Sequence, residues 1–147
     1  ARLSKLARLS GWQWWVLLST PLVLSLTALR LRFGGFRPTR ARLRRPPPST
    51  LPAPDQLAVA RDTAFALAVA VKYGPWRPQC LLRSLALGWF LGRRGIPFKV
   101  RIGVPGAGVA ARSPGDPDFS AHAWVEHAGV VLNDRPDIAS EFAAFDA

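Results

Sequence analysis

Hydrophobic and polar positions divide the chain into three segments. The first, 1–36, contains an uncharged and mostly apolar run over 9–29. A stretch rich in Arg and Pro follows over 37–54. In the third segment, 55–147, apolar positions recur first with a helical period and then in short strand-like runs. We therefore predict a hydrophobic helical arm, a linker and one folded domain.

The apolar run over 9–29 allows three interpretations. It is long enough to span a bilayer core, which needs about 20 residues, and it has tryptophans at one end, as interfacial segments do. Pro21 stands in its middle and should kink or split a helix, which favours a pair of short helices packed on the domain or on a partner protein. The third interpretation is a cleaved signal peptide, although no small-x-small cleavage site follows the run.

Residues 37–54 read RPTRARLRRPPPSTLPAP, with three consecutive prolines. Prolines oppose a helix and favour an extended chain, so we predict a solvated tether over this stretch. Its arginines would also suit a binding strip for an acidic partner or for anionic lipid.

The third segment is predicted to contain two helices followed by an antiparallel sheet. Asp55 is placed to cap the first helix, which Gly74-Pro75 ends. The second helix, 80–94, has Arg83 as its only charge before its last turn, and a helix that is apolar nearly all round is a buried one. Strand-like runs follow at 98–104, 119–127 and 130–134. This order predicts an α+β domain.

Charge and composition narrow the class of function. The net charge is +11, but residues 1–54 hold ten basic and no acidic groups, whereas 55–147 hold ten basic and nine acidic ones. The basic excess therefore belongs to the arm, which lacks interleaved aromatics and a helix–turn–helix pattern, so we expect no nucleic acid as a partner. The single cysteine excludes an intramolecular disulfide and fits a reducing, cytoplasmic setting. The sequence has no metal-ligand cluster and no phosphate loop, so we expect no metal and no cofactor.

Cys80 opens the predicted buried helix, and this position favours a reactive thiol. The positive end of the helix dipole and the free N–H groups of the first turn stabilise a thiolate, and they could also bind an oxyanion. The alternative is a buried structural cysteine, since this small side chain packs readily in cores. Arg83 lies one turn later on the same helix edge, where it could steady the thiolate, bind substrate or form a salt bridge.

The two histidines, His122 and His127, both fall in the second strand-like run. Their odd separation puts them on opposite faces, so only one can face the helix that carries Cys80. His122 lies in an apolar stretch and shares its face with Trp124, and we take it as the candidate base; a structural histidine is the alternative. His127 stands at a turn and is predicted to be solvated.

Asp134 can orient His122 if the hairpin that joins their strands has a three-residue loop. Glu126 then pairs with Val130, and His122 stands opposite Asp134 on the same face of the sheet. Gly129 would be the left-handed residue of that loop, since it adopts a positive φ at no steric cost. We therefore predict this register.

Other roles for Asp134 stay open. A two-residue Ala128-Gly129 turn would face Asp134 away from His122, and Asn133 would then be the first orienter to test. Asp134 could also act only as a turn or helix cap. In the favourable register, Cys80, His122 and Asp134 form a set of nucleophile, base and orienter.

Four motifs follow one another along the third segment. They are a Cys-Leu-x-Arg-Ser-Leu-Ala-Leu helix that begins at Cys80, an Arg-x-Gly-Ile-Pro turn, an Ala-His-Ala-Trp-Val-Glu strand and a closing Leu-Asn-Asp. Together, over about residues 55–135, they resemble the transglutaminase-like B2 leader peptidases of lasso peptide biosynthesis. The resemblance implies a papain/transglutaminase-like cysteine protease core, a buried helix against an antiparallel sheet, with Cys80 as nucleophile, His122 as base and Asp134 as orienter.

The resemblance also implies a function. Such enzymes release the leader from a ribosomally made precursor peptide and so expose the amino terminus of the core peptide for macrolactam closure. They act with a small leader-binding recognition protein, B1, and a separate ATP-dependent lasso cyclase forms the ring. The implied partners are therefore the precursor, the leader-binding protein and the cyclase. Arg83 and Trp124 are candidate substrate-binding residues.

Two competing functions remain. A transglutaminase-like acyltransferase would use the same triad, because water and an amine attack the same thioester. A non-catalytic, membrane-associated scaffold is the non-enzymatic alternative, and the presence of Cys, His and Asp at the motif positions argues against it. We expect a cytoplasmic protein with possible membrane association through 9–29.

Overall fold

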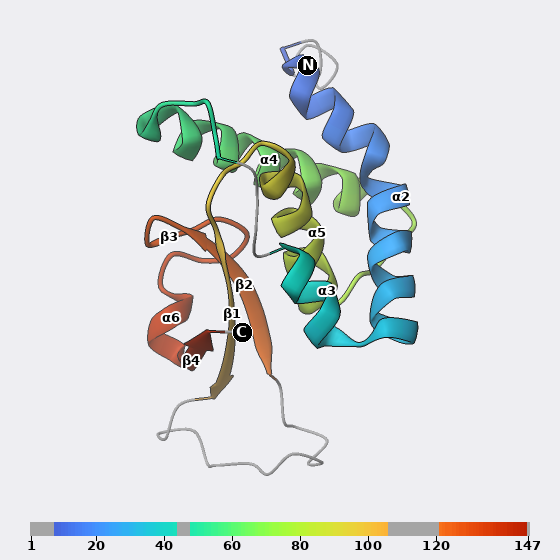
Figure 1. Cartoon of the computed structure of the whole chain (residues 1–147), viewed down its shortest axis with the longest axis vertical. Helices are drawn as coiled ribbons and strands as arrows, with labels where there is room; N and C mark the ends of the chain where they lie inside the picture. The colour runs from blue at the N-terminus through green and yellow to red at the C-terminus, as the bar shows by residue number, and fades with distance from the viewer. Residues whose placement is uncertain (1–7, 44–47, 106–120, 147) are drawn as a thin grey trace.

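The computed structural model describes residues 8–43, 48–105 and 121–146 (Figure 1). Its helices are α2 (Gly11–Gly34), α3 (Phe36–Leu43), α4 (Ala53–Tyr73), α5 (Cys80–Arg93) and α6 (Ile138–Glu141). Its strands are β1 (Lys99–Pro105), β2 (His122–His127), β3 (Val130–Val131) and β4 (Phe142–Asp146). The order of helices and strands confirms the predicted α+β class.

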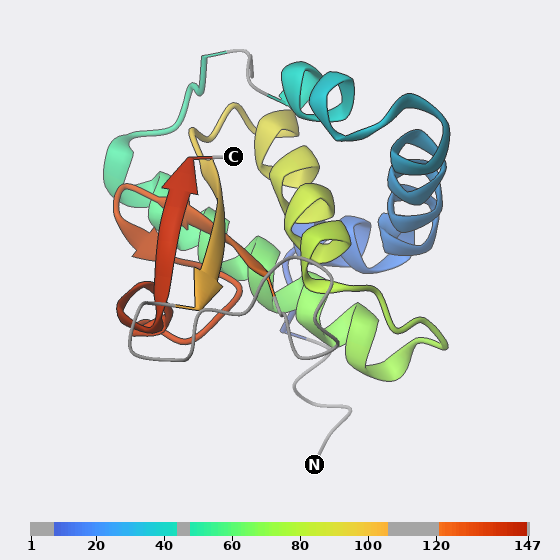
Figure 2. The same cartoon turned by 90° about the horizontal axis from the view of Figure 1, so that it is seen from below.

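The fold is layered around α5. The strands form one antiparallel sheet in the order β3-β2-β1-β4. Figure 2 shows α5 between this sheet and α2, and α4 contacts both helices. Because α5 is covered on several sides, its apolar sequence is accounted for, and Leu85, Leu87, Phe90 and Leu91 have no exposed surface. The predicted buried helix is confirmed.

The end of α5 follows from its glycines. Gly95 takes the left-handed conformation, with φ of 66°. The N–H of Ile96 donates to the Leu91 carbonyl at 3.0 Å, and the N–H of Gly95 donates to the Gly92 carbonyl at 3.1 Å. These are the two hydrogen bonds of a Schellman motif, which ends the helix where the sequence predicted.

The apolar run near the N-terminus forms the single helix α2, not the pair of short helices that we considered. Pro21 lies inside it, and Figure 1 shows the axis of α2 bending, as an interior proline causes. Its inner face buries Val16, Val23 and Leu24 in a core shared with α4 and α5. The boundary drawn at residue 54 therefore does not separate two cores.

Part of the predicted linker is helical. Residues 36–43 form α3, and Gly35, with φ of 77°, separates it from α2. Pro38 falls in the first turn, where a backbone N–H has no helical partner to lose. The three prolines that motivated an extended tether begin only at Pro46, so they do not oppose a helix that ends at Leu43.

Several other boundaries differ from the predicted ones. α4 begins at Ala53 with Pro52 at its N-cap, so Asp55 lies in the first turn and is not the cap. The run predicted over 130–134 is a strand only at Val130–Val131. Neither α6 nor β4 was predicted, because α6 is one turn long and the sequence FAAFD of β4 does not alternate. The predicted loop between the first two strands lies mostly outside the described residues.

Two leucines of α2 test whether this helix belongs to the core. Leu24 is 3% exposed and Leu22 is 62% exposed. We expect Leu24→Ala to lower the free energy of unfolding by about 2–5 kcal/mol, because it leaves a cavity in the shared core. Leu22→Ala should change it by less than about 0.5 kcal/mol. Urea unfolding followed by circular dichroism measures both values, and equal effects would contradict this packing.

Candidate active site

The hairpin between β2 and β3 has a two-residue turn, not the three-residue loop that we predicted. Glu126 pairs with Val131, one residue later than expected. Ala128 has φ of 49° and Gly129 has φ of 78°, and two positive φ angles in sequence are typical of a type I′ turn. The positive φ of Gly129 is confirmed. The three-residue loop is wrong because Ala128 also adopts a left-handed conformation, which is uncommon for a residue other than glycine.

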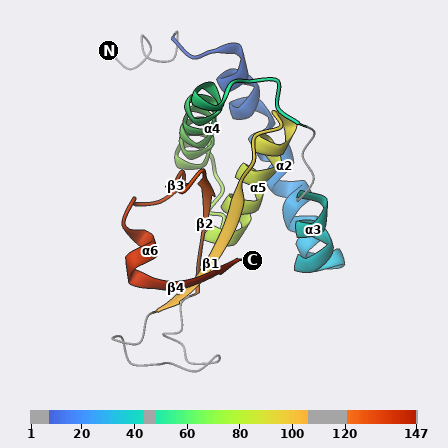
Figure 3. The same ribbon diagram turned by 60° about the vertical axis from the view of Figure 1, so that its left-hand side comes forward.

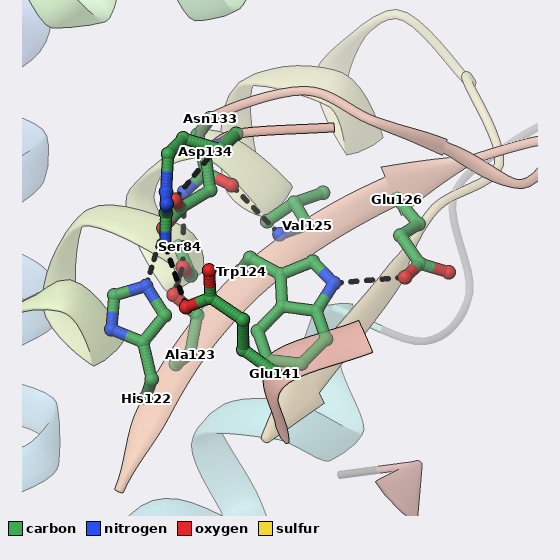
Figure 4. Close-up of polar contacts among 10 residues, drawn as sticks. Ser84, His122, Ala123, Trp124, Val125, Glu126, Asn133, Asp134 and Glu141 are labelled. Carbon is green, nitrogen blue, oxygen red and sulfur yellow. Dashed lines mark hydrogen bonds and ion pairs between the residues drawn. The ribbon is translucent and has the colours of Figure 1, made fainter. Parts of the chain in front are cut away.

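Asp134 nevertheless contacts His122. A ladder continued in the observed register would place Asp134 opposite Ala123, on the other face of the sheet. The strand instead ends at Val131, and the chain bends over residues 132–134, so that it leaves the ladder after the N–H of Leu132. The Nε2–H of His122 then donates to Oδ2 of Asp134 (Figure 4). The predicted contact is present although the register from which we derived it is wrong.

Asn133 holds this bend in place. The N–H of Leu132 donates to the Val125 carbonyl at 2.9 Å, as in a regular ladder. The N–H of Val125, however, donates to Oδ1 of Asn133 at 2.8 Å, where a continued ladder would use the Leu132 carbonyl. Asn133 is therefore a structural residue here and not the orienter of the histidine.

A buried hydroxyl connects the bend to the sheet and to α5. Nδ2 of Asn133 donates to Oγ of Ser84 at 3.1 Å, and this hydroxyl donates to the Ala123 carbonyl at 3.1 Å. Ser84 has no exposed surface. We call Ser84, Ala123 and Asn133 the Ser84 junction, and Figure 4 shows it directly beside His122 and Asp134.

Cys80 is placed through this junction. It opens α5 one helical turn before Ser84, on the same side of the helix. The other end of α5 leads to Pro97, whose carbonyl accepts from His127 at the far end of β2. The start of α5 therefore lies toward the end of β2 where His122 stands. Cys80 is half-buried, and its thiol is not in a disulfide.

The structure brings His122 and Asp134 into contact, and it relates Cys80 to them by packing alone. In the described part of the chain, no hydrogen bond joins the Cys80 thiol to the His122 ring. The Nε2 atom of His122 is used by Asp134, so Nδ1 is the ring nitrogen left for a thiol. Gln79, at the N-cap of α5, makes no side-chain capping bond, which leaves the N–H groups of the first turn for an oxyanion.

Asp134 is held by more than the histidine. Its Oδ1 accepts from the backbone N–H of Arg135 at 2.8 Å. The Arg135 guanidinium in turn donates to Glu141 at 2.6 Å, and this hydrogen bond raises the pKa of Arg135. Both carboxylate oxygens of Asp134 thus have donors, which fixes the plane of the carboxylate against the imidazole.

His127 is not the solvated residue that we predicted. It is 6% exposed, and its Nδ1–H donates to the Pro97 carbonyl at 2.6 Å. Strand alternation puts it on the face of Val125, which packs in the core with α5. It is therefore His127 whose face lies against α5, and His122 approaches that helix only at the end of the sheet, where α5 begins.

Trp124 has no exposed surface, which corrects our expectation that it contacts substrate directly. Its indole N–H donates to Oε1 of Glu126 at 2.8 Å, and its ring stacks beside that of His122, with centroids 6.2 Å apart. A Cβ on Gly103 would lie 3.0 Å from this ring and 2.5 Å from Cβ of Phe142, so the close packing under His122 requires glycine there. Sequence reasoning missed Gly103, because its pairing with His122 is seen only in the sheet of the folded chain.

Arg83 lines a pocket of about 510 Å³ between α4 and the bend that carries Asp134. Arg61 and Phe65 of α4 form the opposite wall. Neither Cys80 nor His122 lines this pocket, so it lies beside the candidate site, on the side of Asp134. Arg83 therefore stays a candidate for substrate binding.

Comparison with protein families finds one match, to the transglutaminase-like superfamily, over residues 23–145. The chain belongs to this superfamily. The match begins inside α2, in agreement with the packing of this helix in the core. Superfamily membership is consistent with cysteine peptidase or acyltransferase activity. Comparisons with curated proteins and with solved structures find no match.

The two histidines should respond differently to replacement. We expect His127→Ala to lower the free energy of unfolding by about 1–3 kcal/mol, because it removes a buried side chain together with its hydrogen bond to the Pro97 carbonyl. His122→Ala should cost no more than about 1 kcal/mol, since its pair with Asp134 is partly exposed. Chemical denaturation of both variants gives the comparison, and the reverse order would contradict the strand faces described above.

Replacing Asn133 tests the bend. We expect Asn133→Ala to lower the free energy of unfolding by about 1–3 kcal/mol, because the Val125 N–H and the Ser84 hydroxyl each lose a partner. Asp137→Ala is the control in the same segment, since Asp137 is exposed and makes no side-chain capping bond, and it should change stability by less than about 0.5 kcal/mol. A wild-type stability for Asn133→Ala would show that the junction does not hold the bend.

Proposed function

We propose that the protein is a cysteine peptidase that removes the leader peptide from a ribosomally made lasso peptide precursor before macrolactam formation. The observation that carries this proposal is the contact between Asp134 and Nε2 of His122 at the end of the sheet where α5 begins with Cys80. Membership of the transglutaminase-like superfamily supports thiol chemistry. The sequence motifs that resemble the B2 leader peptidases support the choice of substrate.

The proposed triad begins with Asp134 as orienter. Its carboxylate accepts the Nε2–H of His122, which fixes the tautomer with an unprotonated Nδ1. Nδ1 then takes the proton of the Cys80 thiol, and the thiolate attacks the scissile carbonyl carbon of the precursor. The free N–H groups at the start of α5 stabilise the oxyanion that forms.

The intermediate collapses as the C–N bond breaks. His122 gives its proton to the departing amine, which becomes the new amino terminus of the core peptide. The leader is left as a thioester on Cys80. His122 next removes a proton from water, the hydroxide attacks the thioester, and the leader leaves with a carboxylate while Cys80 recovers its thiol.

Substrate and partners follow from the same resemblance. We propose that Arg83 helps to hold the precursor from the pocket beside Asp134, because a guanidinium donates readily to peptide carbonyls and carboxylates. A leader-binding protein would present the precursor, and the lasso cyclase would take the product. We place these steps in the cytoplasm, where a single free thiol stays reduced.

Replacing the thiol tests the proposed chemistry. Cys80→Ala should abolish cleavage of a precursor peptide in the presence of a leader-binding protein, because no other cysteine exists to attack the carbonyl. Mass spectrometry of the products and circular dichroism of the variant are the measurements, and we expect an unchanged fold. Cleavage by Cys80→Ala at the wild-type rate would refute the mechanism.

The same assay separates the peptidase from an acyltransferase. With a primary amine added to the wild-type reaction, a peptidase yields the leader as a free acid, and a transferase yields the leader amide in its place. A product that is mostly amide at low amine concentration would favour the transferase, with the triad unchanged.

A further inference from the structure

The outer face of α2 carries a continuous apolar stripe. Its members are between 44% and 77% exposed and are Leu18, Leu22, Leu26, Leu29 and Phe33. At about 100° per residue they fall within an arc of about 80° on the helix. We call these residues the α2 outer stripe. Spacing of this kind places side chains in one row along a helix, as a binding face requires.

The stripe is distinct from the face that packs on the protein. Val16, Val23 and Leu24 point into the core shared with α4 and α5, so α2 is apolar on two faces and only one of them is covered by the described chain. Figure 3 shows α2 on the outside of α5, with the sheet on the other side. Apart from Phe65 and Tyr73, every exposed large hydrophobic residue among those described lies on α2. Such a concentration marks an interaction surface.

Positive charge borders the stripe. Arg30 and Arg32 are exposed and, at about 100° per residue, lie about 40° beyond its two edges. At the other end of α2, Trp15 stacks on Trp89 with centroids 6.0 Å apart, and the exposed Arg93 lies over the Trp89 ring at 5.4 Å. Residues 1–54 contain no Asp or Glu, so this part of the chain contributes no negative side chain that would repel an anion.

A pocket continues the stripe at its far end. Its volume is about 410 Å³, and it lies in the corner between α2 and α3. Leu29 and Phe33 of the stripe line it together with Arg30 and Pro38. Apolar walls with a guanidinium at the rim would accept an acyl chain below a phosphate group.

We propose that the α2 outer stripe docks on a membrane surface that contains anionic lipids, with α2 lying in the plane of the membrane. The leucines and Phe33 would enter the boundary of the acyl chains, the tryptophans would lie at the interface, and the arginines would contact lipid phosphates. The charge on this face selects anionic lipid over a neutral apolar partner, because α2 and α3 contain no Asp or Glu to neutralise the bordering arginines.

The docked helix lies on the membrane and does not span it. Among the described residues, Gly11–Gly34 is the one helix long and apolar enough to cross a bilayer. Spanning would withdraw Val16, Val23 and Leu24 from the core that they share with α4 and α5. Docking through the outer stripe leaves that core intact, so the packing of α2 favours the in-plane arrangement.

Vesicle binding by the full chain tests the proposal without any peptide substrate, so its outcome is independent of the proposed peptidase. Vesicles of phosphatidylcholine alone are compared with vesicles of equal parts phosphatidylcholine and phosphatidylserine by co-flotation. We expect binding to the anionic vesicles and at least about tenfold weaker binding by the double variant Leu22→Gln/Phe33→Gln, because two apolar side chains leave the interface. Arg30→Gln/Arg32→Gln should weaken binding to anionic vesicles by about tenfold and make it less sensitive to salt.

The matched control replaces the exposed apolar residues of α4. Phe65→Gln/Tyr73→Gln removes two large exposed side chains outside the stripe and should bind vesicles as the wild type does. Urea unfolding should give all three variants a stability close to that of the wild type, since every replaced side chain is exposed. Weaker binding by the stripe variant and by the arginine variant, with wild-type binding by the α4 variant, would then support the proposal.

Several results would overturn it. The wild type could fail to bind either kind of vesicle, or the stripe variant could bind as well as the wild type. Loss of a dimer, or loss of binding to a leader-binding protein, in the stripe variant without any vesicle binding by the wild type would make the stripe a protein interface. Wild-type protein that stays in the membrane at high salt and alkaline pH would show a spanning helix instead of a docked one.

Discussion

The buried hydroxyl of Ser84 is the interaction on which the arrangement of the candidate site depends. It donates to the Ala123 carbonyl of β2 and accepts from Asn133 in the bend, so one oxygen joins a helix, a strand and a loop. Each residue of the junction lies close in the chain to one proposed catalytic residue. Ser84 follows Cys80 by one helical turn, Ala123 is next to His122, and Asn133 is next to Asp134. A hydrogen bond of this kind contributes only about 1 kcal/mol net, but leaving its buried partners unpaired costs about 1–3 kcal/mol. Because breaking the junction is costly, it holds in place the three chain segments that carry the proposed catalytic residues.

That junction can form only if α5 is buried, and this requirement explains the role of α2. A helix that is apolar on most sides needs cover on both the sheet side and the far side. The sheet covers one side of α5, and α2, α4 and α3 contact it on other sides, as Figures 2 and 3 show for α2. The superfamily match begins at residue 23, inside α2, which agrees with a helix that the core requires. The apolar character of α2 thus has a structural cause on its inner face, and only the outer stripe needs a separate explanation.

How far the sequence could predict this site depends on the range of each interaction. The bounds of α5 were predictable, because Gly95 and the single charge before its last turn are local signals. The contact of Asp134 with His122 was predicted from the alternation of side chains along an unbroken hairpin. The side chain of Asn133 breaks that hairpin, because its Oδ1 takes the place of a backbone carbonyl as the acceptor. The burial of His127 depends on the carbonyl of Pro97, 30 positions away in the chain, and no local pattern indicates it. The strand β4 was missed because FAAFD has no alternation, so only its pairing with β1 defines it.

The contrast between the environments of the two histidines favours His122 as the candidate base. His127 is enclosed, and its Nδ1 donates to a backbone carbonyl. His122 is partly exposed, and the Asp134 carboxylate holds its Nε2, so its Nδ1 is the ring nitrogen left to face a thiol. The two histidines of β2 thus differ: His127 packs in the structure, and His122 is placed where it could react. The outer stripe of α2 lies on the far side of α5 from the sheet, so a membrane bound there would leave His122 open to a peptide.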